Sequence, residues 1–242
     1  MKRYKIKYRN VALLVLALSF LTFTMSGLAL YRTRAELTPM QESYVGELDV
    51  ARLNVELLEN GNAVDGELLA DLEIVEPGKT YEEEIKTSNT TEVNEYVRVI
   101  VQKYWLDKDG NKDGSLDPEL IKLSYNDGYD THAYNESNWK ENKAEATKER
   151  HVYYLNESLK GNTESPALFT HVTIDKEIAT TYTIDESQEN VIKYVYQYDG
   201  YSFVIKVEAQ SVQCNHGTKA IKSVWGVSNV TADDGSQKLS IN

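Results

Sequence analysis

The stretch Val93-Asn-Glu-Tyr-Val-Arg-Val-Ile-Val-Gln-Lys-Tyr-Trp105 decides the fold class. Most of its side chains are β-branched or aromatic, and they alternate between two faces with a period of two residues. This pattern predicts a long β-strand. One face holds Tyr96, Arg98, Ile100, Gln102 and Tyr104, and the other holds Val97, Val99, Val101, Lys103 and Trp105.

Similar runs flank this strand. Asp199-Gly200 separates two alternating runs within Val191–Val207, which predicts a β-hairpin. Only Asn142–Glu149 has a helical composition. Many short strands with turn residues between them predict an all-β fold, a single β-sandwich or jelly-roll domain. The other expected strands are Gly46–Leu58, Leu68–Val75, Thr80–Thr87, Leu120–Tyr125, Arg150–Leu155 and Leu168–Ile174.

The first 35 residues differ from the rest. Residues 2–9 are basic, and Val11–Tyr31 is mainly apolar, which is the pattern of a secretion signal. The apolar run is also long enough to span a membrane if it is not cut. Small residues permit cleavage after Ala29 or Ala35. We therefore expect four parts: a signal peptide or uncleaved membrane segment over 1–35, a mature N-terminal segment over 36–43, the β-sandwich domain over 44–230 and a polar C-terminal tail over 231–242.

The formal net charge is −12, and the residues before Glu36 include seven basic and no acidic side chains. The rest of the chain is therefore still more acidic, which excludes nucleic acid and anionic lipid as partners. Membrane contact is expected only through the N-terminal segment. An acidic surface suits two purposes, solubility outside the cell and binding of divalent cations, and the composition leaves both open.

Signatures of catalysis are missing from the sequence. It contains no His-Glu-x-x-His, no Gly-x-Ser-x-Gly and no phosphate-binding loop, so the chain is expected not to be an enzyme. The single cysteine excludes an intramolecular disulfide. Cys214 follows a predicted strand and is expected to be a small buried side chain rather than a reactive thiol.

An Asp-rich loop follows the strand that ends near Trp105. Read from Asp109, its spacing matches positions 1, 3, 5, 6 and 9 of a calcium-binding loop, with Gly114 at the turn position. Position 12 is Leu120 instead of Glu, and strands flank the loop instead of helices. A plain hairpin loop is therefore the alternative. The candidate calcium ligands are Asp109, Asn111, Asp113, Asp117 and Glu119.

Four short segments resemble the TasA/camelysin type of exported biofilm-matrix protein. Gly46-Glu-Leu-Asp-Val50 is similar to the first strand of that family, and Val75-Glu-Pro-Gly-Lys-Thr80 to its Pro-Gly turn. Thr87-Ser-Asn-Thr-Thr91 resembles its Asn-rich turn, and Phe203–Gln210 its late strand. The central segment Lys108–Ser165 departs from the fibre-forming members. The resemblance implies secretion to the cell surface or matrix after processing by a signal peptidase.

The resemblance also implies a mode of assembly. In this family the processed N-terminal segment adds as a strand to the sheet of another subunit, either the same protein or a related matrix protein. Here the donor would be Glu36–Val50, and its apolar contacts would be Leu37, Met40, Tyr44 and Val45. The alternatives are a monomeric binding module or adhesin, with or without stabilising calcium, and more distantly a camelysin-like metalloprotease.

Overall fold

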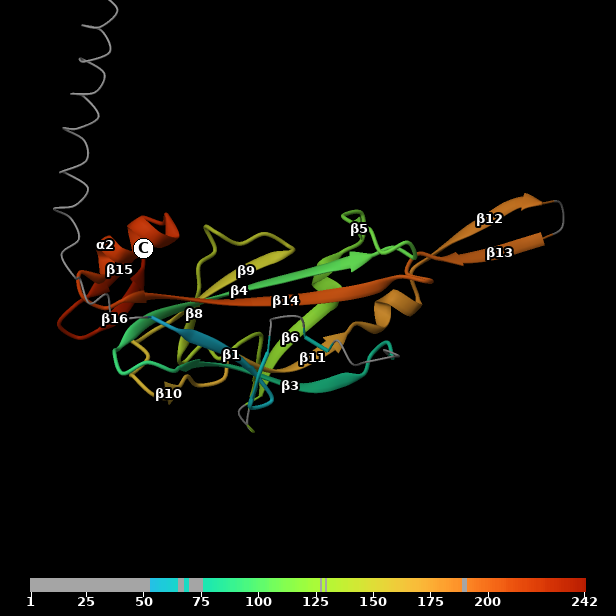
Figure 1. Ribbon diagram of the computed structural model, residues 1–242. Coiled ribbons are helices and arrows are strands. Elements are labelled where there is room, and N and C mark those ends of the chain that lie inside the picture. Colours follow the sequence, from blue (N-terminus) through green and yellow to red (C-terminus); the bar gives the residue numbers. More distant parts are fainter. Residues whose placement is uncertain (1–52, 65–67, 70–75, 127, 129, 189–190) are drawn as a thin grey trace, which may run out of the picture. The chain divides into compact units, whose positions relative to one another are not determined.

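In the computed structural model, the alternating stretch around Val99 forms β4 (Glu95–Leu106) in the middle of an antiparallel sheet (Figure 1). Residue pairs join β4 to β14 (Ser202–Gln213) along the whole of both strands. On its other side β4 pairs with β9 (Arg150–Leu155), and β9 pairs with β8 (Trp139–Glu141). We call this the central sheet, and the two-residue β5 (Lys112–Asp113) pairs with the end of β4.

The structure describes residues 53–64, 68–69, 76–126, 128, 130–188 and 191–242. The predicted signal or membrane segment over 1–35, the segment over 36–43 and the start of the predicted domain at 44 lie outside these residues. The strands predicted at 46–58 and 68–75 lie partly outside them. Within the described ranges, no helix has the length and apolar composition needed to cross a membrane.

A second antiparallel sheet, the outer sheet, packs on one face of the central sheet. Its strand order is β2-β1-β3-β11-β6-β7, and β10 pairs with the end of β3 on the side that faces β11, opposite β1. Its members are β1 (Val55–Glu59), β2 (Asn62–Ala63), β3 (Thr80–Asn89), β6 (Ile121–Asn126), β7 (Thr131–His132), β10 (Thr163–Glu164) and β11 (Phe169–Ile174). Two short 3-10 helices, η1 (Pro118–Leu120) and η2 (Lys176–Ala179), precede β6 and follow β11.

The main core lies between these two sheets, so the predicted all-β sandwich is confirmed. The face of β4 that holds Val97, Val99, Val101 and Trp105 supplies the central-sheet half, and β3, β6 and β11 supply much of the other half. A buried Val, Leu, Ile or Phe side chain contributes about 1.5–3 kcal/mol to the free energy of folding. The largest fully buried members include Trp139, Ile85, Ile121, Phe169 and Ile205.

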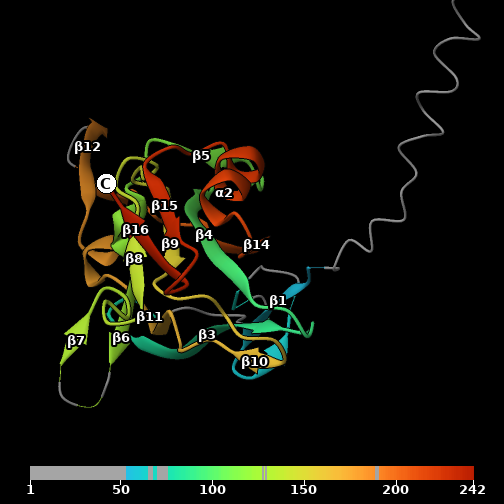
Figure 2. The same ribbon diagram turned by 90° about the vertical axis from the view of Figure 1, so that its left-hand side faces the viewer.

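The other face of the central sheet is also covered, which the sequence had not suggested. Figure 2 shows α2 (Gly217–Trp225), β15 (Val230–Asp233) and β16 (Lys238–Ile241) on one side of β4 and β9, and the outer sheet on the other. A second core forms here from Tyr96, Ile100, Val152, Tyr154, Val212, Ile221, Trp225, Val230 and Leu239. This packing leaves no room at residue 217, where a Cβ would lie 2.5 Å from the Tyr96 ring.

Two predictions about chain segments are therefore wrong. Residues 231–242 are not a tail, because β15 and β16 form a hairpin whose Leu239 is 4% exposed. Asn142–Glu149 is not helical but turns, with the Glu145 amide donating to the Asn142 carbonyl at 3.0 Å. The Asn142 side chain bonds the Ala144 amide at 3.2 Å, which favours the turn over a helix.

The hairpin predicted around Asp199-Gly200 is also paired differently. Gly200 does lie in a turn, with φ of +77°. However, β13 (Val191–Tyr196) pairs with β12 (Tyr182–Gln188) in a separate two-stranded sheet, whereas β14 pairs with β4. The turn therefore joins two sheets instead of two partners within one sheet.

The second core generates the first prediction. Leu239→Ala removes a buried side chain and should lower the free energy of unfolding by about 2–4 kcal/mol. Ser240→Ala, at the exposed neighbouring position, should change it by less than about 0.5 kcal/mol. Urea denaturation followed by circular dichroism measures both, and equal stabilities of the two variants would show that 231–242 does not pack on the sheet.

Candidate functional site

The outer edge of β14 is the candidate site. In an antiparallel strand the N–H and C=O of one residue point to the same side, and alternate residues point to opposite sides. The Ile205 carbonyl accepts from the Leu68 amide at 3.0 Å, so residue 205 points away from β4. Because the β4–β14 register has no shift, Val207 and Ala209 point the same way. Among the described residues, Leu68 makes the only main-chain hydrogen bond to this edge.

A groove of about 500 Å³ runs beside this edge, between β14 and β1. Leu57 and Val207 lie in it and are buried members of the main core, so the groove leads from the surface into the sandwich. Glu56 and Glu208 supply its acidic groups. We call it the edge groove, and it is lined by Val55, Glu56, Leu57, Ala63, Val64, Val207, Glu208 and Ala209.

A second groove of about 460 Å³ lies at the end of β14, against α2. Its described lining residues include Lys219 and no acidic residue, although the whole chain is acidic. Val224 is 66% exposed at its rim. We call it the helix groove, and it is lined by Leu53, Ser211, Val212, Gln213, His216, Lys219, Ala220, Ser223 and Val224.

The predicted donor-strand residues Leu37, Met40, Tyr44 and Val45 all lie outside the described part of the chain. Sequence reasoning did not single out the outer edge of β14. An alternating strand pattern does not tell an edge strand from a central one, and β14 has the same pattern as β4.

The Asp-rich loop closes through its own side chains. Asp107 Oδ1 accepts from the amides of Asp109 and Asn111 at 2.9 and 2.8 Å, and the Asn111 bond is the main reason why the pKa of Asp107 is lowered. Asp113 Oδ1 accepts from the Ser115 amide at 2.8 Å, and bonds to Ser115 lower the pKa of Asp113. These are the contacts of a hairpin loop.

The last two candidate calcium ligands lie at the start of η1. Asp117 caps this helix by accepting from the Glu119 amide at 3.2 Å. Across the residues that the structure describes, no group of three or more His, Cys, Asp or Glu side chains is placed to hold a metal ion. Calcium binding by this loop stays a prediction of the sequence.

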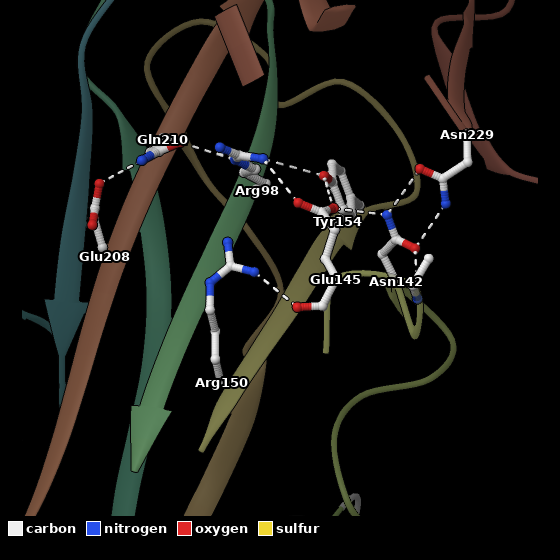
Figure 3. A network of polar contacts seen from close by, with 9 residues as sticks. Arg98, Asn142, Glu145, Arg150, Tyr154, Glu208, Gln210 and Asn229 are labelled. Carbon is white, nitrogen blue, oxygen red and sulfur yellow. Dashed lines mark hydrogen bonds and ion pairs between the residues drawn. The ribbon is translucent and has the colours of Figure 1, made fainter. Parts of the chain in front are cut away.

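A polar network lies on the α2 side of the central sheet (Figure 3). Arg98, which is 7% exposed, donates to Gln210 at 2.9 Å and forms an ion pair with Glu145 at 3.4 Å. Glu145 also accepts from Tyr154 at 2.6 Å and from Asn142 at 2.7 Å. Burial, followed by the bond to Glu145, raises the pKa of Tyr154 to about 12, so its hydroxyl stays protonated.

This network joins three parts of the chain. Asn142 and Asn229 exchange side-chain hydrogen bonds of 2.8 and 3.3 Å, which tie the 142–149 turn to the segment between α2 and β15. The Arg98 guanidinium stacks 4.9 Å from the Trp225 ring of α2. The network is buried and internally paired, so we assign it to holding the α2 layer on the sheet.

A pair of carboxyl groups, the buried Glu83 and the partly exposed Glu59, lies between β1 and β3. Glu83 is 2% exposed, and burial, followed by a hydrogen bond with Glu59, raises its pKa from 4.5 to about 8. Asn60 lies 3.5 Å from both Glu83 oxygens, and Glu59 accepts from the Leu69 amide at 3.1 Å. At neutral pH Glu83 is therefore protonated and shares its proton with Glu59.

Three other titratable groups of the described residues are held by burial or by a partner. Burial lowers the pKa of Lys103, whose ammonium donates to the Ile121 carbonyl at 2.8 Å inside the sandwich. His151 pairs with Glu141 at 2.7 Å beside the Tyr153 ring. Cys214 is partly buried, and burial raises its pKa to about 11, which keeps it as a thiol.

Comparison with known proteins gives no match: no family model, no curated protein and no solved structure matches the chain.

The carboxyl pair generates the second prediction. The folded-state pKa of Glu83 lies above its unfolded value, so its contribution to stability is present at acid pH and is lost as the pH rises from 4.5 to about 8. Glu83→Gln keeps a neutral side chain that can donate to Glu59. The variant should therefore become more stable relative to the wild type as the pH rises from 5 to 8, by up to about 1.4 kcal/mol per pH unit.

Denaturant unfolding between pH 5 and 8.5 measures this difference. Glu82→Gln changes the exposed neighbour and serves as the control, because its curve should stay parallel to that of the wild type. Parallel curves for the wild type and Glu83→Gln would contradict a neutral Glu83 in the folded protein.

Proposed function

We propose that this chain is an exported structural subunit of the cell surface or extracellular matrix, and that copies assemble by β-strand addition at the outer edge of β14. The observation that carries the proposal is that no described residue makes a main-chain hydrogen bond to the outward groups of Val207 and Ala209, which lie beside a groove that reaches the core. Main-chain groups on such an edge supply affinity to an added strand, and alternate side chains supply its register.

The composition of the mature N-terminal segment supports its role as the donor. Two of the predicted contacts, Met40 and Tyr44, stand at even-numbered positions, as do Leu48 and Val50, so these four share one face of an extended strand with Glu42 and Gly46. The other two, Leu37 and Val45, fall on the opposite face, where the remaining positions from 41 to 49 are polar. An added strand would thus turn a mainly apolar face toward the sandwich interior and a mainly polar face outward. Pro39 lacks the N–H for pairing, so the paired part of the donor begins after it.

Export is part of the same proposal. The basic and apolar start of the chain has the pattern of a segment processed by a signal peptidase, and the segment stays as a membrane anchor if it is not cut. The acidic composition and the single cysteine suit a bacterial extracellular protein. The proposal includes no catalytic step.

The third prediction tests strand addition on the protein that begins at Glu36. Ala209→Pro removes the outward N–H, whereas residues 208 and 210 keep their bonds to β4, so the sandwich should persist. Ala209→Val keeps the N–H and is the matched control. We expect fibres from the parent protein and from Ala209→Val, and monomers from Ala209→Pro and from a deletion of 36–44.

Light scattering after size exclusion and negative-stain microscopy, with and without calcium, measure assembly, and circular dichroism checks the fold. A parent protein that stays monomeric at all concentrations would reject a fibre subunit and favour the binding module. Fibres that survive both Ala209→Pro and the deletion would reject strand addition at this edge.

A further inference from the structure

The outer edge of β14 extends beyond the edge groove. The β4–β14 register has no shift, so the odd-numbered residues of β14 point outward along its whole length. Leu68 closes this edge at Ile205, and no described residue makes a main-chain hydrogen bond to the outward groups within 207–213. At about 3.3 Å per residue, 207–213 offers about 23 Å of pairing length. An added strand can therefore reach from the edge groove to the helix groove, which is lined by 211–213.

The two grooves open on opposite faces of β14. Val207 belongs to the main core and Val212 to the second core, so odd-numbered side chains face the outer sheet and even-numbered side chains face α2. The edge groove lies between β14 and β1, whereas the helix groove lies between β14 and α2. Figure 2 shows β1 and α2 on opposite sides of β14. An added strand would therefore turn its alternate side chains toward the two grooves.

A buried carboxyl group lies at the far end of this edge. Glu95 is 0% exposed and stands opposite Gln213 in the β4–β14 register. Neither of its carboxyl oxygens makes a hydrogen bond to a described residue. Burial raises the pKa of Glu95, and the nearby Ser211 hydroxyl and Asn54 backbone offset this only in part. A buried polar group without a partner is destabilising, so a hydrogen-bond donor that arrives at this end of the edge is favoured.

We propose that the helix groove is the far end of the site for strand addition, and that it receives Val45 of the segment added from another copy. Ala209 in the edge groove and Val212 in the helix groove are three positions apart, so a strand that fills both grooves needs apolar side chains on both faces. Within 36–50, Val45 and Leu48 have this spacing. The inference rests on the proposed function, because it assigns the direction and register of the added strand.

The spacing selects an antiparallel strand. With Val45 opposite Val212, such a strand pairs Gly46 with Ser211, Leu48 with Ala209 and Val50 with Val207. Leu48 and Val50 then enter the edge groove. A parallel strand would instead place Glu42 opposite Ala209 and turn a carboxylate toward the core. In the antiparallel register Tyr44 falls opposite Gln213, so its hydroxyl is the donor offered to Glu95.

This register requires a second copy. In the same chain, the Asn54 backbone lies beside Glu95 and therefore level with Gln213. A Val50 placed opposite Val207 would lie about 20 Å from that level along β14. The chain from Val50 to Asn54 spans at most about 14 Å even when fully extended. The added strand therefore comes from another copy.

Cysteine pairs test both ends of the site in the protein that begins at Glu36, on a Cys214→Ser background. Val45→Cys with Ser223→Cys reports on the helix groove, and Asp49→Cys with Glu208→Cys reports on the edge groove. Each pair should oxidise to a ladder of covalent trimers and larger species on a non-reducing gel. The exchanged pairs, Val45→Cys with Glu208→Cys and Asp49→Cys with Ser223→Cys, are the matched controls and should give roughly tenfold less ladder, because their thiols are held too far apart.

Val45→Ser supplies an arm without added cysteines. The loss of an apolar side chain from the helix groove should raise the protein concentration at which fibres form by roughly tenfold. Glu47→Ser changes the same face of the strand opposite Gln210, outside both grooves, and is the matched control. It should change this concentration by less than about twofold. Light scattering over a dilution series measures both.

The outcomes separate this inference from the proposed function. Ladders from both direct pairs, with the shift for Val45→Ser, support it. No ladder from Val45→Cys with Ser223→Cys above its exchanged controls overturns it, even if fibres form and depend on residues 36–44. A disulfide closed within one copy also overturns it, because the segment then binds its own chain. A parent protein that forms no fibres rejects the proposed function itself. Circular dichroism shows whether each variant is folded.

Discussion

The unbroken pairing of β4 with β14 is the interaction on which the rest of the structure depends. It runs over all 12 residues of β14 without a register shift. Because the side chains of a strand alternate, an unbroken register sends every second side chain to each face. One face then meets the outer sheet in the main core, and the other meets α2 and the β15–β16 hairpin in the second core. A one-residue slip would exchange Val207 with Glu208 and lose both cores together.

Because both faces of the central sheet are covered, polar side chains on this sheet need partners within the protein. Arg98 stands at a position that would be solvent-exposed on a one-sided sheet, but α2 covers it. A buried guanidinium is tolerated only with partners, and Glu145, Gln210 and the Trp225 ring supply them. The 142–149 turn follows from this requirement, because it brings Glu145 to Arg98. The composition of these residues favours a helix, but the turn is what places Glu145 beside the buried Arg98.

Much of the fold could be predicted from the sequence, because β4 alternates with a period of two residues and β9 and β11 are short runs with β-branched and aromatic residues. Pairing could not be predicted in the same way. Val191–Tyr196 alternates equally well beside β12 or β14, and nothing in its own residues selects between them. The β15–β16 hairpin was not predicted, because Lys238–Ile241 has only two apolar residues, which is too few for a clear strand pattern. One of them, Leu239, is nevertheless buried. The edge groove could not be predicted for a related reason. Whether a strand lies at the edge of a sheet depends on its neighbours, and the sequence of the strand alone does not give them.

An edge strand with free main-chain groups can bind a specific partner strand, but it can also cause aggregation, since any extended chain can pair with it. The protein limits this hazard in two ways: Leu68 occupies the edge at Ile205, and Glu56 and Glu208 place negative charge in the edge groove. A donor must therefore offer apolar side chains on one face and tolerate acidic neighbours on the other.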